Sequence, residues 1–164
     1  AGVSRGAWSH HFPSMNALML DVAKHLMGRV YERLGAVLQE LSQGKGGAEE
    51  LIATVWHEFF ASEVNEIYLQ LLVASRREPG LAERLVELTG VLERNLEALA
   101  MHRFAPVPDA VLQPIDLLLL TRWVLRGIAL DRPLLTEDEV DRGLKAWSRL
   151  AESQLRPGPG SRKL

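Results

Sequence analysis

Histidines near acidic or other histidine residues are the first candidates for catalysis or metal binding in this chain. His10 and His11 are adjacent, and on a helix adjacent side chains diverge by about 100°, so the two cannot chelate one metal ion together. The segment that begins His57-Glu58 has Ala61 where a zinc-protease motif needs its second histidine. Neither pattern therefore predicts a metal site.

The remaining candidates for chemistry are also weak. Residues 44–47, Gly-Lys-Gly-Gly, lack the spacing and the preceding strand of a phosphate-binding loop, so we expect a flexible connector between helices. The chain has no cysteine, which excludes disulfides and thiolate zinc sites. The sequence predicts no catalytic residue, no metal site and no cofactor. An all-helical enzyme using His57 and Glu58 is an alternative that no motif supports.

The most specific pattern is the sequence of residues 1–18, AGVSRGAWSHHFPSMNAL. Gly2 permits a tight turn, and Ser4 is a good N-cap for a short helix over residues 5–12. Pro13 ends that helix, and Ser14 can cap a new one. The pattern predicts the second half of a helix-turn-helix, followed by a long helix.

This segment resembles the AGVSRGALYHHFPSKEAL signature of the TetR-type (tetracycline-repressor-like, TetR/AcrR) transcriptional regulators. The chain begins inside the motif and without methionine, so we expect the native protein to be longer there. The resemblance implies a ligand-responsive DNA-binding regulator, a repressor that an unknown small-molecule effector releases from double-stranded operator DNA. The alternative is a helical small-molecule-binding or interaction module with weakened or no DNA readout.

The resemblance also assigns the positions that face DNA. They are Ser4, Arg5, Gly6, Ala7, Ser9, His10 and His11. We expect Arg5 to contact a base, since a guanidinium group can pair with O6 and N7 of guanine. Residues 1–33 carry a net charge of +2 although the whole chain carries −2, so only this end favours a polyanion. Ser9 and Met15 stand where the family usually has phosphate-binding tyrosine and lysine, which favours the alternative.

Helical periodicity continues through most of the chain, and no segment alternates as a strand does. Apolar residues from Leu18 to Leu41 form one stripe on a predicted helix over residues 14–42, roughly 40 Å long. Further helices are predicted at about 48–61, 62–78, 81–102, 109 or 114 to 131, and from 137 onward. Thr136 and Glu139 form a capping box for the last helix.

These elements predict an all-α fold with two parts and a tail. Residues 1–42 would be a partial helix-turn-helix domain plus a connecting helix, and residues 43–156 an effector-binding and dimerisation domain. Residues 157–164, rich in proline and glycine, would be a disordered tail.

The fifth predicted helix has an unusually wide apolar surface, with four consecutive leucines from Leu117 to Leu120. Such a helix needs protein on two sides. It is either the centre of a monomeric bundle or packs one face against a second copy. The family's last two long helices build its dimer interface, so the resemblance favours a homodimer. The residues expected there are Leu118, Arg122, Leu125, Val140, Leu144 and Trp147.

The resemblance also implies an effector pocket between the helices, and aromatic and polar residues there could bind a ligand. The candidates are Trp56, His57, Phe60, Tyr68, His102 and Trp123. Each one alone is more commonly a structural residue, and the composition of the set favours only an apolar or aromatic molecule. No apolar run approaches the roughly 18–20 residues that span a bilayer, and no secretory signal is present, so we expect no membrane association and a cytoplasmic protein.

Overall fold

The computed structural model describes residues 14–42 and 47–158, and these residues form an all-α fold. The helices are α2 (Met15–Ser42), α3 (Ala48–Val55), α4 (Glu63–Ser75), α5 (Pro79–Arg103), α6 (Pro114–Asp131) and α7 (Glu137–Gln154). A π-helical turn (Trp56–Phe60) follows α3, and a 3-10 turn (Arg132–Leu134) follows α6. Two short strands, β1 (Phe104–Pro106) and β2 (Leu155–Pro157), form an antiparallel pair.

Local capping determines where the helices begin. The Ser14 hydroxyl accepts a hydrogen bond from Ala17 N at 3.1 Å, which confirms the predicted start of the long helix. For α6 the later of the two predicted starts is correct. Gln113 N donates to the Asp116 carboxylate at 3.0 Å, and Pro114 occupies the first turn, where its missing N–H costs nothing.

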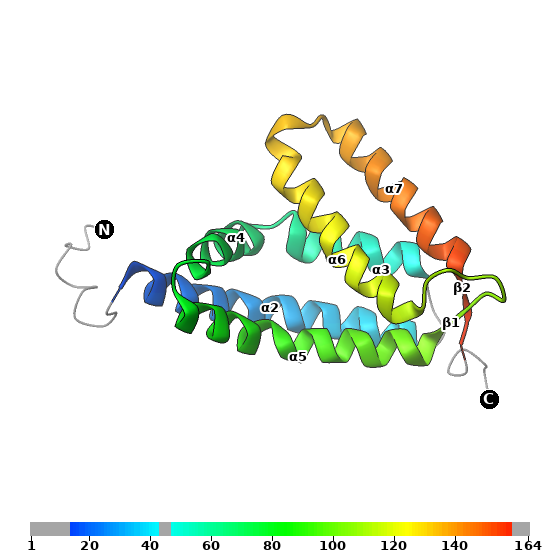
Figure 1. Ribbon diagram of the computed structural model, residues 1–164, viewed down its shortest axis with the longest axis horizontal. Coiled ribbons are helices and arrows are strands. Elements are labelled where there is room, and N and C mark those ends of the chain that lie inside the picture. The colour runs from blue at the N-terminus through cyan, green and yellow to red at the C-terminus, as the bar shows by residue number, and fades with distance from the viewer. Residues whose placement is uncertain (1–13, 43–46, 159–164) are drawn as a thin grey trace.

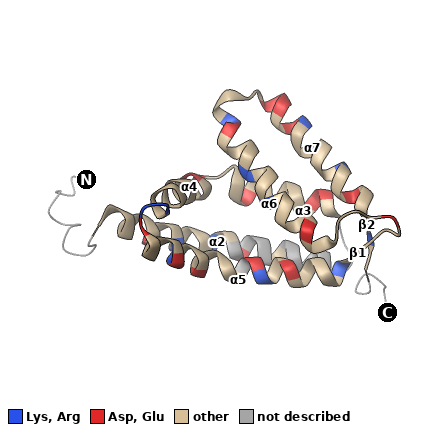
Figure 2. Cartoon of the chain, viewed as in Figure 1, with Lys and Arg blue, Asp and Glu red and all other residues tan. Residues whose placement is uncertain are grey.

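The capping box of α7 is present as predicted. Glu139 N donates to the Thr136 hydroxyl at 3.3 Å, and Thr136 N donates to the Glu139 carboxylate at 2.8 Å. This backbone hydrogen bond, together with one from the Thr136 hydroxyl, lowers the pKa of the Glu139 carboxyl. The first turn of α7 is acidic throughout (Figure 2), which suits the positive end of a helix dipole.

The helices pack in two layers around one core. Helices α2 and α5 lie side by side in one layer, and α6 and α7 form a pair in the other (Figure 1). Helix α4 packs on one end of α2 and α5, and α3 contacts α7. The core contains Met27 of α2, Leu71 of α4 and Leu125 of α6, each at most 1% exposed. None of the described helices combines the length and the apolar character needed to cross a bilayer.

The helix predicted over residues 48–61 changes to a π-helical turn at Trp56. Ala61 N donates to Trp56 O at 2.8 Å, five residues back, and the Asn65 side chain donates to Phe60 O at 3.0 Å. The wider turn leaves Trp56, Phe59 and Phe60 all buried. A regular helix would rotate successive residues off one face, and π-helical turns of this kind are common at functional sites.

More of the C-terminal segment is ordered than its composition predicts. The composition predicts a disordered tail from residue 157, but Pro157 belongs to β2, opposite Phe104 of β1. Gly158 N then donates to Arg103 O at 2.7 Å. Main-chain pairing needs no apolar side chains, which is why neither strand was evident from the sequence pattern. The rest of the expected tail, residues 159–164, lies outside the described residues.

Candidate functional site

The residues expected to face DNA lie outside the described residues. They are Ser4, Arg5, Gly6, Ala7, Ser9, His10 and His11, and the described chain begins at residue 14. Met15, in the first turn of α2, is 53% exposed, so an uncharged side chain faces solvent at this position.

A cavity of about 330 Å³ lies among the helices, lined by residues between Met27 and Leu155. Residues of α3, the π-helical turn, α5 and α6 form most of its walls. Single residues come from the other elements: Met27 of α2, Tyr68 of α4, Ala151 of α7, Phe104 of β1 and Leu155 of β2. Such a volume falls at the lower end of the range for small-molecule sites. Elements distant in the sequence meet here, which helical periodicity alone does not reveal.

Aromatic rings form one wall of the cavity. The rings of Phe59 and Phe60 meet edge to face, with centroids 5.0 Å apart, and Phe59 and Tyr68 do so at 5.8 Å. These arrangements are favourable for aromatic pairs and fix the rings in place. The guanidinium carbon of Arg126 lies 5.5 Å from the centroid of the Tyr68 ring, within the range of a cation–π interaction.

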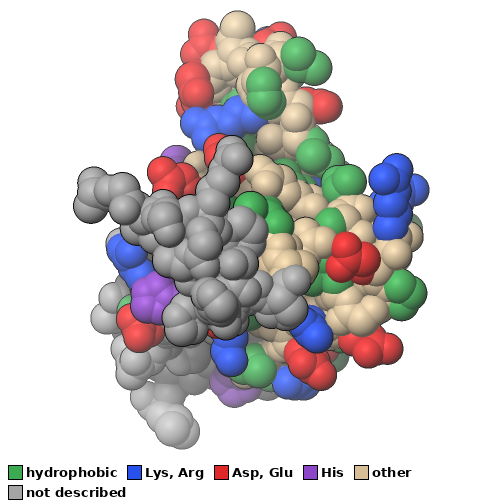
Figure 3. All heavy atoms as spheres, turned by 90° about the vertical axis from the view of Figure 1, so that its left-hand side faces the viewer, with side chains coloured by type: hydrophobic (Ala, Val, Ile, Leu, Met, Phe, Trp, Pro, Cys, Tyr) green, Lys and Arg blue, Asp and Glu red, His purple; other side chains and the backbone are tan. Residues whose placement is uncertain are grey.

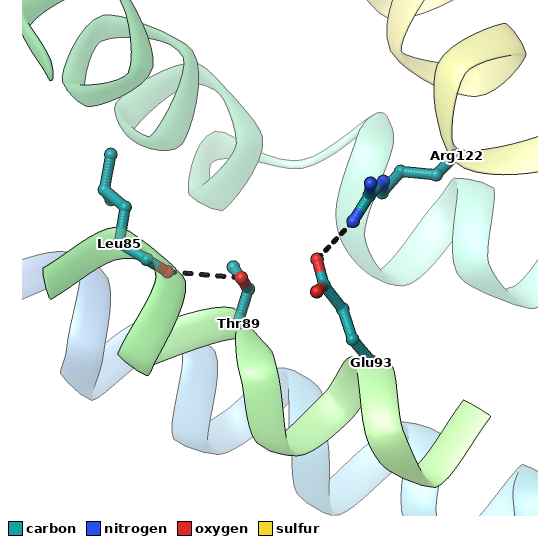
Figure 4. A network of polar contacts seen from close by, with 4 residues as sticks. All are labelled: Leu85, Thr89, Glu93 and Arg122. Carbon is teal, nitrogen blue, oxygen red and sulfur yellow. Dashed lines mark hydrogen bonds and ion pairs between the residues drawn. The ribbon is translucent and has the colours of Figure 1, made fainter. Parts of the chain in front are cut away.

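Most polar groups of the inner walls bind other groups of the chain. The Thr89 hydroxyl donates to Leu85 O at 3.2 Å, and Arg122 of α6 forms an ion pair with Glu93 of α5 (Figure 4). The Thr121 hydroxyl donates to Leu117 O at 2.7 Å. It also accepts a hydrogen bond from the indole N–H of Trp147 at 2.9 Å, which links α7 to α6.

Arg126 differs from Arg122 in its ion pairing, because no carboxylate forms a salt bridge with its guanidinium group within the described residues. The Nε atoms of both arginines are buried without a hydrogen-bond partner. Two further carboxylates, Glu97 and Asp116, line the cavity but are exposed to solvent.

The structure brings only some of the six expected pocket residues to the cavity. Phe60 and Tyr68 line it. Trp56 is buried in the core without lining the cavity, and His57, His102 and Trp123 are exposed. Periodicity identifies residues that share a helix face but does not say which face borders the cavity.

Of the six residues expected at a dimer interface, two are buried and four are partly exposed. Leu118, Arg122 and Leu125 line the cavity, and Val140, Leu144 and Trp147 belong to the core or pack against it. Leu125 and Val140 are at most 2% exposed, so neither offers a surface to a partner. The assignment of the other four residues to a dimer interface stays a prediction.

Apolar side chains of α6 are also exposed to solvent. We call four of them the α6 stripe: Ile115, Leu119, Trp123 and Leu130, between 37% and 56% exposed. Ile115 and Leu119 border the cavity as well. Hydrophobic side chains are also exposed at the end of the molecule where α6 leads into α7 (Figure 3). The four-residue spacing from Ile115 to Trp123 could have identified this stripe in the sequence.

The other candidates for chemistry gain no support. His57 is exposed and Glu58 half-buried on the π-helical turn, and neither lines the cavity. Within residues 14–42 and 47–158, no three histidine, aspartate or glutamate side chains are placed to hold a metal ion.

Comparison with known proteins gives one informative similarity. Over 95 residues, or 58% of its length, the chain is 37% identical to the HTH-type transcriptional regulator CymR of Pseudomonas putida. The match covers 45% of that protein, so the chain spans less than half the length of this curated relative. No family model matches the chain, and no solved structure matches it.

Proposed function

We propose that this chain belongs to a TetR-type, ligand-responsive DNA-binding transcriptional regulator that acts in the cytoplasm as a repressor. The observation that carries the proposal is the 37% identity to an HTH-type regulator. The pattern of residues 1–18, with its serine cap and its proline before α2, supports it independently. The proposal gives the chain a binding function and no catalytic one.

The cavity supports the ligand-responsive part of the proposal. Met27, which is 1% exposed, lines the cavity and belongs to α2. Helix α2 begins at Met15, shortly after the part of the sequence to which we assign DNA recognition. A ligand that packs differently against Met27 in two positions of α2 would change DNA affinity, which is a coupling free energy between two sites.

The α6 stripe supports the homodimer. Trp123 and Leu130 are more than half exposed on a helix whose other side contributes Leu117 and Leu125 to the core. A second copy packed on this face would cover them, and would present two recognition helices. Helix-turn-helix dimers place these helices about 34–36 Å apart, one turn of DNA.

A module that binds a small molecule but does not read DNA is the second candidate. Met15 favours it, because an exposed methionine cannot neutralise a phosphate. Replacing this residue tests that candidate directly. In a DNA-reading protein, Met15→Lys should add one phosphate contact, raising affinity for operator and non-specific DNA alike and steepening the salt dependence.

Gel-shift titration of the full-length protein against its own promoter region tests the proposal. We expect specific, salt-sensitive binding that Arg5→Ala weakens by about 5- to 150-fold, the effect of losing one base contact. Arg149→Ala, at an exposed arginine of α7, is the matched control and should bind normally. Light scattering should find dimers in all three proteins.

Two results would contradict the proposal. Sequence-blind or absent DNA binding by the dimeric wild-type protein would favour the second candidate. Normal DNA binding by Arg5→Ala would remove that residue from the interface.

A further inference from the structure

We infer that the cavity binds a small organic anion with an apolar body, and that Arg126 binds its anionic group. The inference rests on the proposed ligand response and specifies the chemistry of the ligand. It starts from a charge at the cavity wall that the chain itself does not neutralise.

The inner wall carries two guanidinium groups and one carboxylate that pairs with only one of them. Arg122 and Arg126 are one turn apart on α6, so both side chains project from the same face toward the cavity. Glu93 forms its ion pair with Arg122 (Figure 4). Within the described residues no salt bridge neutralises the positive charge of Arg126, and its Nε atom, like that of Arg122, is buried without a hydrogen-bond partner.

A buried donor that has lost its water and gained no acceptor is costly. An anionic ligand would supply that acceptor, and a guanidinium group can bind a carboxylate or a similar group through two parallel hydrogen bonds. The Tyr68 ring, 5.5 Å from the guanidinium carbon, holds the Arg126 side chain at the wall. The group is thus positioned before the ligand arrives, which reduces the entropy cost of binding.

The remainder of the wall sets the nature of the ligand body. Phe59, Phe60, Leu118 and Leu125 all line the cavity. The hydroxyl protons of Thr89 and Thr121 are already donated to main-chain carbonyls, so neither is free to donate to a ligand. A ligand with few polar groups beyond its anionic end fits such a surface.

The two exposed carboxylates of the cavity do not favour a cationic ligand. Asp116 accepts a hydrogen bond from Gln113 N at the start of α6, and Glu97 is exposed, so water solvates both. A cationic ligand drawn to them would bring its charge into the cavity where Arg126 already lies. An anionic ligand would instead neutralise Arg126, which is less exposed to solvent than either carboxylate.

Isothermal titration calorimetry with matched probes tests the inference. The probes are 2-naphthoate and 2-naphthamide, which share a ring system and differ in charge, with octanoate and octanamide as a flexible pair. In the wild-type protein we expect the acid of at least one pair to bind about tenfold tighter than its amide. The pair that shows the larger preference tells whether the ligand body is flat or flexible.

Variants at the wall assign the preference to one residue. Arg126→Gln should remove the preference while the amide still binds, which also shows that the variant is folded. Arg126→Lys should keep part of the preference, and Arg149→Gln, on the exposed side of α7, should keep all of it.

Equal affinities for acid and amide, binding of neither, or a preference that survives in Arg126→Gln would overturn the inference. The gel-shift experiment contains no ligand, so the two proposals fail separately. Specific DNA binding without any anion preference refutes the inference alone, whereas an anion preference without DNA binding refutes the regulator.

Discussion

The ion pair between Glu93 and Arg122 should contribute only modestly to stability. Their side chains are 39% and 37% exposed, so water reaches both. Ion pairs with this degree of exposure contribute about 0.5–1 kcal/mol, far below the Coulomb energy of a buried pair. We therefore expect a coupling free energy of about 0.5–1 kcal/mol between the two residues.

A double-mutant cycle measures that coupling. Glu93→Gln, Arg122→Gln and the double variant are unfolded in urea beside the wild-type protein, and the coupling is the non-additive part of the three changes in the free energy of unfolding. The coupling should decrease in high salt, since exposed charges are screened. As a control, the cycle on Lys145 and Asp141 of α7, a more exposed pair at 3.7 Å, should give a smaller value.

The result has a direct bearing on the cavity. A coupling above about 3 kcal/mol would mean that Glu93 and Arg122 behave as a buried ion pair. The cavity would then hold much less water, and the unpaired charge of Arg126 would be less well solvated. A coupling indistinguishable from zero would show that Glu93 does not pair with Arg122 in solution. Glu93 would then be free to neutralise Arg126, and the reasoning from the unbalanced charge would be refuted. With the pair intact, Glu93→Gln should raise the affinity for 2-naphthoate, because it leaves a second guanidinium group unpaired.

Three further predictions concern the capping box of α7 and the residue that follows β2. Thr136→Ala should lower the free energy of unfolding by about 1 kcal/mol in urea titrations, because α7 loses its N-cap, and an unchanged value would show that the cap is not formed. The pKa of Glu139 is lowered in the folded chain, so its stabilising contribution is complete above the pKa of the unfolded state and is lost as the pH falls through the folded-state value. The melting temperature of Glu139→Gln should accordingly approach that of the wild type in acid, and a constant difference would contradict this. Gly158→Ala should lower the free energy of unfolding by about 1–3 kcal/mol in urea titrations. The reason is that a Cβ atom at this position would lie 2.9 Å from the backbone carbonyl carbon of Arg103. An unchanged free energy of unfolding would show that β2 can shift to make room.

The sequence determined those features that depend on neighbours along the chain. The serine cap before α2, the capping box of Thr136 and Glu139 and the all-α class follow from short-range spacing, and the structure confirms each of them. The pattern of residues 1–18 likewise predicts a transcriptional regulator, and similarity to an HTH-type regulator supports that interpretation.

Only the tertiary structure decided which way each helix faces. Leu118 and Leu125 border the cavity, whereas Trp123, expected in the pocket, lies on the α6 stripe. The apolar surface of α6 extends around much of the helix, so periodicity could not distinguish its two sides. The pairing of Arg122 with Glu93, which leaves Arg126 without a carboxylate, joins residues of two helices. Such a pairing depends on how α5 and α6 pack together, and no local rule of sequence contains that information.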